Sequence, residues 1–293
     1  MKLNVSRTRK RAVFLLATIV VLGGCVGQSG GAMLSIMDIQ MSGGGVEDMT
    51  ITAKVPEFAR SGGVFGWQLV VQPTVDVKNF RFEIYDHGLF MAVSGENIIG
   101  TSDINANTTK TFPLTYTMGD AGLAESTDIK MRSFYVSNTT ISTTVAVLSE
   151  VEYFQRKAQG KLGEISVSTW SSTNPLELTV SWSDPMPLLD AQAVQMYVDY
   201  QNSGSGFIEK LGIGEVTFIV PENIQFVTCD DYKLEGNSIT LKRDLDFVQK
   251  QAKRSTCTFK AKASGTIDSR SLVGTALYTY EIDSEVTVPI IQK

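Results

Sequence analysis

The chain has 293 residues, of which 19% are charged, and its 26 Lys and Arg against 31 Asp and Glu give a net charge of −5. An acidic balance argues against nucleic acid and anionic lipid headgroups as partners. The sequence is rich in Thr, Ser, Val and Gly. Branched side chains suit a pleated sheet, while Gly and Ser supply turns. The composition therefore predicts an all-β protein.

The first 25 residues carry an export pattern. Five cations with no acid among them precede an apolar run at 12–22, which Gly23, Gly24 and Cys25 follow. A positive flank, a short apolar segment and small residues before a cleavage point are the parts of a secretory signal. As a helix the run would reach only about 16 Å, well short of the ~30 Å hydrocarbon core. A membrane-spanning helix is therefore not expected here.

The Gly23-Gly24-Cys25 sequence resembles the lipobox of lipoprotein signal peptides. The resemblance implies that residues 1–24 are removed and that Cys25 is lipidated, which would anchor the protein to the cell membrane on its extracytoplasmic side. The Gly-rich residues that follow predict a flexible tether over 25–46. The alternatives are an ordinary signal peptide and an uncleaved signal anchor with an incidental cysteine. Cleavage removes five cations and no acid, which leaves a net charge of −10.

The two remaining cysteines, Cys229 and Cys257, form an even pair in a chain that is expected to be exported. Such pairs form disulfides in oxidising compartments. The alternative is two buried thiols. Two cysteines without a matching pair of histidines do not complete a tetrahedral metal site, so we expect no metal or other cofactor.

Within the tether, residues 33–41 form a short apolar insert between glycine pairs. Met33, Met37 and Met41 are spaced as on one face of a helix, which is compatible with a methionine stripe and a copper site. The same residues also alternate as in a strand. A helix of nine residues between glycines is marginal alone, so we favour a first or edge strand.

Period-2 alternation predicts a β-sandwich over residues 47–158. The expected strands of this first domain are 49–55, 67–72, 77–85, 90–93, 109–117, 129–136 and 143–153. Residues 155–163 are interpreted as the joint to a second domain.

The alternation starts again after the joint and predicts a second sandwich over 159–293. The expected strands are 165–170, 176–182, 194–200, 216–220, 224–228, 238–242, 255–262, 274–283 and 286–291. Residues 201–206 read as a turn. Leu245, Val248 and Ala252 have helical spacing, which predicts a short helix inside the loop between the cysteines.

The segment 194–204, a hydrophobic strand that runs into Asn202-Ser203-Gly204, resembles the signature of CARDB-like and related immunoglobulin-like modules. Residues 75–86 occupy a comparable place in the first half but lack the Asn-x-Gly turn. The resemblance implies two immunoglobulin-like β-sandwich domains in tandem. Such modules are common in archaeal and bacterial surface proteins, which implies adhesion, spacing or scaffolding rather than catalysis.

Few residues carry the marks of a catalytic or metal site. The one histidine, His87, lies between Asp86 and Gly88, a pattern typical of a hairpin turn. No Gly-x-Ser-x-Gly elbow accompanies it. The acids at 184, 190, 230, 231 and 283 could bind calcium in loops, but none has EF-hand spacing. We therefore interpret them as surface charges and expect no catalytic residue.

Two sequons, at Asn107 and Asn138, are candidates for glycosylation, although chance also produces sequons in a Thr-rich chain. Exposed aromatic side chains could stack on sugars. The candidates are Trp67, Trp170, Trp182, Tyr278 and Tyr280. Trp182 and Tyr278 lie at inward positions of the alternation, which favours a core role.

These patterns lead to two hypotheses of different class. The first is a non-enzymatic, lipid-anchored surface protein that acts in envelope structure or in contact with another protein. The second is a surface module that binds carbohydrate or another ligand. Aromatic side chains gathered on one sheet would favour the second, and a polar sheet face with an unpaired edge strand would favour the first.

Overall fold

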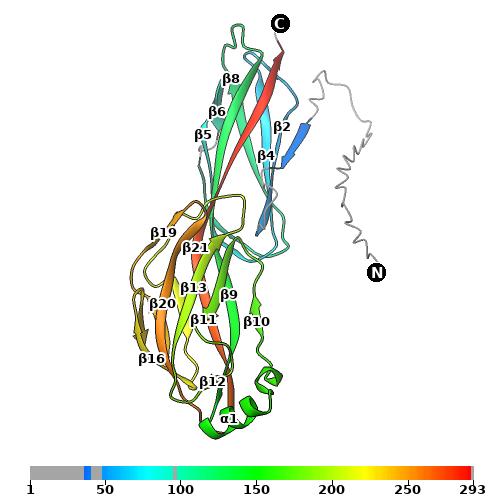
Figure 1. The fold of residues 1–293 in the computed structure, drawn as a ribbon. Helices are drawn as coiled ribbons and strands as arrows, with labels where there is room; N and C mark the ends of the chain where they lie inside the picture. Colours follow the sequence, from blue (N-terminus) through cyan, green and yellow to red (C-terminus); the bar gives the residue numbers. More distant parts are fainter. Residues whose placement is uncertain (1–35, 41–47, 95–97, 292–293) are drawn as a thin grey trace, which may run out of the picture. The chain divides into compact units, whose positions relative to one another are not determined.

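The structure is a computed structural model that describes residues 36–40, 48–94 and 98–291. The described residues belong to one compact unit (Figure 1). The expected signal peptide, Cys25, Met33 and Met41 lie outside the described residues. The fold is all-β, as the composition predicts, with one α-helix in the described part of the chain. No helix among the described residues is long and apolar enough to cross a membrane.

A five-stranded sheet holds the N-terminal strands. Its order is β1 (Ile36–Gln40), β2 (Met49–Pro56), β4 (Val64–Pro73), β8 (Lys110–Met118) and β6 (Phe90–Ser94). Every second side chain of β2 is buried, as the alternation predicts. β1 pairs antiparallel with β2 at the edge of the sheet, so the expected edge strand is confirmed over Ile36–Gln40.

A ten-stranded sheet contains the two longest strands of the described chain. Its main order is β17 (Tyr232–Glu235), β18 (Ser238–Leu241), β15 (Val216–Ile219), β21 (Ile267–Ile291), β9 (Ser126–Leu148), β5 (Val77–Asp86) and β7 (Ile98–Ile104). Three short strands pair with the two long ones: β10 (Thr169–Ser171) and β12 (Leu188–Leu189) with β9, and β3 (Ala59–Arg60) with β21.

A six-stranded sheet completes the fold. Its order is β11 (Leu176–Trp182), β13 (Ala193–Asn202), β20 (Gln251–Ala261), β19 (Leu245–Val248) and β14 (Lys210–Leu211), with β16 (Ile224–Cys229) paired to β20. Cys229 and Cys257 lie directly opposite each other on β16 and β20 and are joined by a disulfide. The expected pairing of these cysteines is therefore present in the structure.

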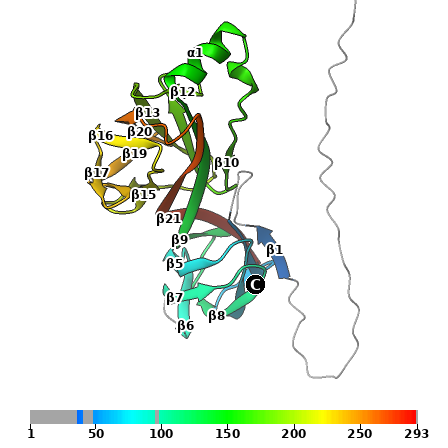
Figure 2. The ribbon, with the colours of Figure 1, turned by 90° about the horizontal axis from the view of Figure 1, so that it is seen from below.

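The two longest strands, β9 and β21, pair along almost their whole lengths. Their antiparallel register runs from Leu148 opposite Ile267 to Ser126 opposite Pro289 without a shift. Figures 1 and 2 show the two strands side by side from two directions. β9 precedes the expected boundary at residue 158 and β21 follows it. One sheet therefore contains strands from both sides of the expected boundary.

The sequence predicted two strands where β9 runs as one. Ser137 and Thr139 stand at inward positions in the middle of β9 and are buried. These two polar residues interrupt the hydrophobic alternation between the expected strands at 129–136 and 143–153. The backbone period of two continues through them, because their hydroxyls find hydrogen-bond partners inside the protein.

The helix expected around Leu245, Val248 and Ala252 is wrong. β19 and β20 form a hairpin there, with Val248 opposite Gln251 and Phe247 opposite Ala252. Gln249 and Lys250, the two residues between the strands, have φ of 51° and 68°. Two successive residues at positive φ make the tight turn that matches the twist of a hairpin. The helical spacing of the apolar residues therefore does not correspond to a helix.

The actual helix, α1 (Glu150–Ala158), begins where a strand was expected to continue to residue 153. Ser149 caps it by accepting a hydrogen bond from the Glu152 N–H. A serine followed three residues later by glutamate is a helix-start signal in the sequence. Acids in the first turn and basic residues in the last add favourable interactions with the helix dipole. A short 3₁₀ turn, η1 (Leu162–Glu164), follows.

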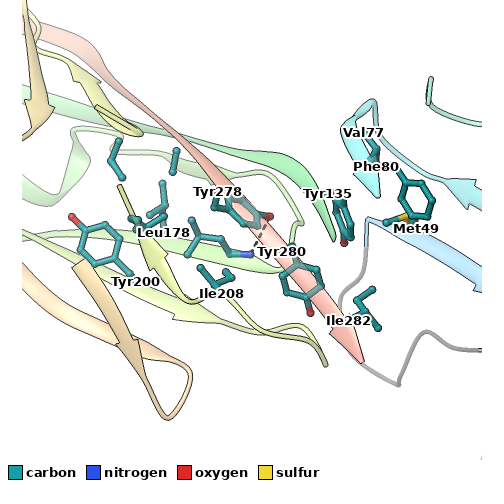
Figure 3. Packing of buried hydrophobic residues seen from close by; sticks show 14 of the residues in the cluster. Met49, Val77, Phe80, Tyr135, Leu178, Tyr200, Ile208, Tyr278, Tyr280 and Ile282 are labelled. Carbon is teal, nitrogen blue, oxygen red and sulfur yellow. Dashed lines mark hydrogen bonds between the residues drawn. The ribbon is translucent and has the colours of Figure 1, made fainter. Parts of the chain in front are cut away.

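The buried apolar residues form one connected cluster. It includes Met49 of β2 and Phe80 of β5 as well as Leu178 of β11. Figure 3 shows Tyr135 of β9 and Tyr278 and Tyr280 of β21 within this cluster. The rings of Tyr135 and Tyr280 lie edge to face with centroids 5.5 Å apart. Residues on both sides of the expected domain boundary thus share one hydrophobic core.

Candidate functional site

Among the described residues, the structure brings together only one pair of predicted site residues, Cys229 and Cys257. Asn107 is exposed at a turn between β7 and β8, with a φ of 57°. Asn138 is exposed on β9, opposite Leu277 of β21. Both sequons therefore present their asparagine to solvent, at separate places in the fold.

His87 occupies the predicted turn. The Gly88 N–H donates to the Asp86 carboxylate over 3.0 Å, and the Phe90 N–H donates to the His87 carbonyl. Gly88 has a φ of 55°, a conformation that glycine adopts without strain. The imidazole faces the ring of Tyr116, with centroids 6.4 Å apart. The turn prediction for His87 is therefore confirmed.

The candidate acids make separate local contacts. Asp231 is buried and pairs with Arg243, so its interpretation as a surface charge is wrong. Asp190 accepts from the Ala263 N–H over 2.9 Å. No group of three or more His, Cys, Asp or Glu in the described ranges could hold a metal ion.

The candidate aromatic residues divide between core and surface. Tyr278, Tyr280 and Trp67 are buried, and Trp182 packs edge to face on Phe259 at 6.1 Å. The core role predicted for Tyr278 is confirmed, while Trp182 is partly buried and packs against the core. Trp170, in contrast, is 60% exposed on β10.

A buried polar cluster, which we call the polar junction, lies on the inner face of β9 at Ser137. Asp48 is only 1% exposed, and its carboxylate accepts from the Ser137 hydroxyl and, over 3.0 Å, from the Asn174 side-chain amide. The Asp48 carbonyl accepts from both the N–H and the hydroxyl of Thr74. These bonds connect the start of β2 to β9 and to the segment before β11.

Tyr278 continues the polar junction on β21. Its hydroxyl accepts from the Leu176 N–H over 3.3 Å, while the Leu176 carbonyl accepts from Thr139 over 2.7 Å. Burial, followed by the negative charge of Asp48, raises the pKa of Tyr278. The phenol therefore stays protonated at neutral pH, and the cluster is suited to holding segments together.

The opposite side of β9 and β21 faces solvent, and we call it the outer face. Arg132 of β9 contacts the carboxylates of Glu281 and Asp283 of β21, each with a closest approach of 2.7 Å. Its guanidinium also lies 5.0 Å from the ring centroid of Tyr85, and that of Arg81 lies 5.5 Å from the ring of Phe134. Cations of this face are therefore held between carboxylates and aromatic rings.

One pocket opens on the outer face, and we call it the Phe207 pocket. Its volume is about 230 Å³. It is lined by Phe134, Phe207, Glu209, Lys210, Gly212, Glu215, Thr279 and Glu281. Burial is the main cause that raises the pKa of Glu281, opposed by the positive charge of Arg132.

The turn after β13 positions Phe207. The Asn202 side chain donates to the Gly206 carbonyl over 2.8 Å and accepts from the Gly204 N–H over 3.0 Å. A Cβ on Gly206 would lie 2.1 Å from the Glu281 carbonyl oxygen, so only glycine allows the backbones to approach this closely. The predicted Asn-x-Gly turn is thus present, and it places Phe207 beside Glu281 of β21.

Sequence reasoning missed Phe207, although one signal was available. Phe207 and Ile208 are adjacent large apolar residues directly after the turn. Successive side chains of an extended segment point to opposite sides, so one of the two must face outward. Ile208 is buried at 4% exposure, whereas Phe207 is 57% exposed.

Two further pockets are more polar in their side chains. One, of about 250 Å³, is lined by Ser171, Ser172, Thr173, Asn174, Glu177 and Ser203. The other, of about 380 Å³, lies beside the ion pair of Arg254 with Asp199. The Phe207 pocket differs from both because it combines two phenylalanine rings with several carboxylates.

Comparison with known proteins finds no family model and no curated protein that matches this sequence. Among solved structures, the chain is similar to "pT26-6p", with 8% identity, a TM-score of 0.23, and coverage of 89% of this chain and 67% of the other. It is also similar to the secreted serine protease VesC from Vibrio cholerae, with 9% identity, a TM-score of 0.20, and coverage of 78% and 50%.

A third similar structure is the C-terminal globular domain of oligosaccharyltransferase from Pyrococcus abyssi. The identity is 14%, the TM-score is 0.23, and the match covers 80% of this chain and 45% of the other. At such low TM-scores these likenesses carry no functional argument.

Proposed function

We propose that the chain is a non-enzymatic, lipid-anchored cell-surface protein whose outer face contacts another surface protein. The opening basic and apolar segments with Gly23-Gly24-Cys25 support export and lipidation. The acidic charge supports a protein partner over nucleic acid.

The observation that carries this proposal is the uninterrupted pairing of β9 with β21. The ladder joins residues on both sides of the expected domain boundary into one hydrogen-bonded unit. A continuous sheet resists bending at a joint, which suits a protein that must hold a binding surface in a fixed arrangement. The outer face of the same two strands is the surface that this arrangement would present.

Anchoring is tested by fractionating native cells that carry the wild-type chain or Cys25→Ser. We expect the wild type in the membrane fraction, with a mature mass that begins at Cys25 and includes added lipid. Cys25→Ser should lose the lipid mass and leave that fraction. A wild-type chain that retains residues 1–24 and carries no lipid would contradict the proposal.

A second candidate function is carbohydrate binding, which the exposed rings of the outer face favour. Tyr85 is 45% exposed, Phe207 57% and Trp170 60%. Trp170 lies opposite Ser142 of β9, whereas Phe207 lies opposite Glu281 of β21. Depletion of the wild type, but not of Trp170→Ala or Phe207→Ala, by insoluble polysaccharide from the native envelope would support this function.

Glycosylation at Asn107 and Asn138 is a proposal supported by the exposure of both side chains. It is tested by intact mass of the native protein and of Asn107→Gln and Asn138→Gln variants. Each variant should lose the mass of one glycan. A native mass without any glycan would contradict both sites.

A further inference from the structure

Three side chains from neighbouring backbone segments, Phe134, Glu281 and Phe207, form a row along one wall of the Phe207 pocket. Glu281 lies opposite Phe134 in the β9 and β21 register. On its other side, Glu281 and Phe207 exchange backbone hydrogen bonds of 2.7 and 2.9 Å. Directly opposite residues place their side chains on the same face of a sheet, with Cβ atoms about 5 Å apart. A carboxylate is therefore flanked by two phenylalanine side chains.

Carboxylates outnumber cations at the pocket, even when Arg132 is included, which already contacts Glu281 and lies 5.9 Å from the ring centroid of Phe134. Three carboxylates, those of Glu209, Glu215 and Glu281, line it together with one cation, Lys210. Lys210 is already paired with Asp244 over 2.7 Å. The ring faces of phenylalanine carry negative potential and attract cations. Rings and carboxylates thus favour the same kind of ligand.

Two arginine side chains of the outer face already lie over aromatic rings. Arg132 lies over Tyr85 and Arg81 over Phe134, at 5.0 and 5.5 Å from the ring centroids. Among the described residues, no lysine or arginine lies over Phe207, whose side chain is 57% exposed. The Phe207 ring therefore offers the same chemistry to a cation from outside.

The size of the pocket limits the ligand. Sites for whole small molecules and cofactors usually enclose roughly 300–1,000 Å³, and the Phe207 pocket encloses about 230 Å³. A single side-chain group fits this volume better than a nucleotide or an oligosaccharide.

We infer that the Phe207 pocket binds an organic cation, the ammonium or guanidinium group of a lysine or arginine side chain on a basic partner protein. The carboxylates of Glu281 and Glu209 would accept hydrogen bonds from its N–H groups, while the Phe207 ring would pack on its alkyl stem and charged group. For its biological partner this inference rests on the proposed contact function and specifies the chemistry of that contact.

The test uses the purified chain and a small probe, Nα-acetyl-lysine methylamide, in a calorimetric or NMR titration. The neutral counterpart acetylated on Nε serves as the control ligand. We expect binding of the cation with a Kd on the order of 1 mM, as suits one ion pair and one ring contact. The neutral counterpart should bind at least about tenfold more weakly, because charge-assisted hydrogen bonds are the stronger kind.

Three variants locate the binding. Glu281→Gln should weaken it by about tenfold and Phe207→Leu by about threefold, since the second keeps apolar cover but removes the ring. Glu285→Gln is the matched control, because it removes the same charge from an exposed position of the same strand and should bind as the wild type does. Near-ultraviolet circular dichroism confirms that each variant is folded.

Several results would overturn the inference. These are no binding of the cation, equal binding of the neutral counterpart, or wild-type affinity in both pocket variants. Absence of probe binding leaves the contact function open, because photo-cross-linking from the outer face in cells measures that function without the probe. Cross-linking that fails while the probe binds would instead remove the contact function.

Discussion

The two sides of the β9 and β21 ladder use the same backbone for different purposes. The inner side buries Tyr135, Tyr278 and Tyr280 and satisfies its polar groups with specific partners, such as Asp48 for Ser137. The outer side carries exposed side chains held by ion pairs in water, such as Arg132 with Asp283. Burial makes each inner contact expensive to lose, whereas solvent screens the outer ones. Substitutions on the inner side should therefore lower the free energy of unfolding by more than substitutions on the outer side.

The largest effect is expected at the polar junction. Asp48→Ala removes the acceptor for Ser137 and Asn174 and leaves both buried without it. We expect a loss of about 4 kcal/mol in the free energy of unfolding. Asp48→Asn is the control, because it keeps the volume and one acceptor and should lose less. Urea denaturation that gives Asp48→Ala the stability of the wild type would contradict this assignment.

The next effect is that of the disulfide. Reduction, or the Cys229→Ser and Cys257→Ser pair, should cost about 3 kcal/mol for a closed loop of 28 residues. Because the ladder joins the sheets, calorimetry should show one transition that moves to lower temperature as a whole. Two transitions, of which only one moves, would show that two independent domains exist after all.

Acidification should separate two acids of β21. Burial raises the pKa of Asp268, but hydrogen bonds from Ser264 and Arg270 outweigh it, so its pKa is lowered in the folded state. Its contribution to stability is present above the unfolded pKa and is lost as the pH falls through the folded one. Asp268→Asn should therefore cost about 1 kcal/mol at neutral pH and progressively less in acid.

Glu281 should show the opposite sign. Burial raises its pKa against the pull of Arg132, and Asp283, Glu209 and Glu83 raise it further. The folded state thus holds the proton more tightly than the unfolded chain, and the stability gained is lost as the pH rises through the folded pKa. Relative to the wild type, Glu281→Gln should become more stable from acid to neutral pH. Urea midpoints of Asp268→Asn and Glu281→Gln across this pH range measure both changes. If the two variants move in the same direction relative to the wild type, one of the assignments is wrong.

The smallest effect on stability is expected on the outer face. Arg132→Ala removes contacts to Glu281 and Asp283, yet all three side chains are partly solvated. The cost should be less than about 1 kcal/mol, as for other surface ion pairs. A loss as large as that of Asp48→Ala would mean that the outer face holds the fold together.

Alternation predicted the strands whose buried side is purely apolar. Met49, Ile51 and Val55 on β2 and Leu176 and Leu178 on β11 lie inward as expected. The continuity of β9 could not be predicted in this way, because the partners that allow Ser137 and Thr139 to be buried come from distant residues. Tertiary contacts, not local pattern, decide such positions.

The candidate site was predictable only in part. The turn at Asn202 was expected from its sequence, and the capping residues of α1 could have been recognised. The row of Phe134, Glu281 and Phe207 could not, because it depends on the register of segments far apart in the chain. A single sequence does not contain that register in readable form.

The central claim, that the outer face is the contact surface, is tested most directly by site-specific photo-cross-linking in native cells. The photoreactive residue replaces Leu277 of β21, which is 51% exposed on the outer face, or Val227 of β16, which is 55% exposed on the six-stranded sheet. The account predicts a discrete cross-linked partner from position 277 and none from position 227. Equal cross-linking from both positions, or cross-linking from 227 alone, would contradict it.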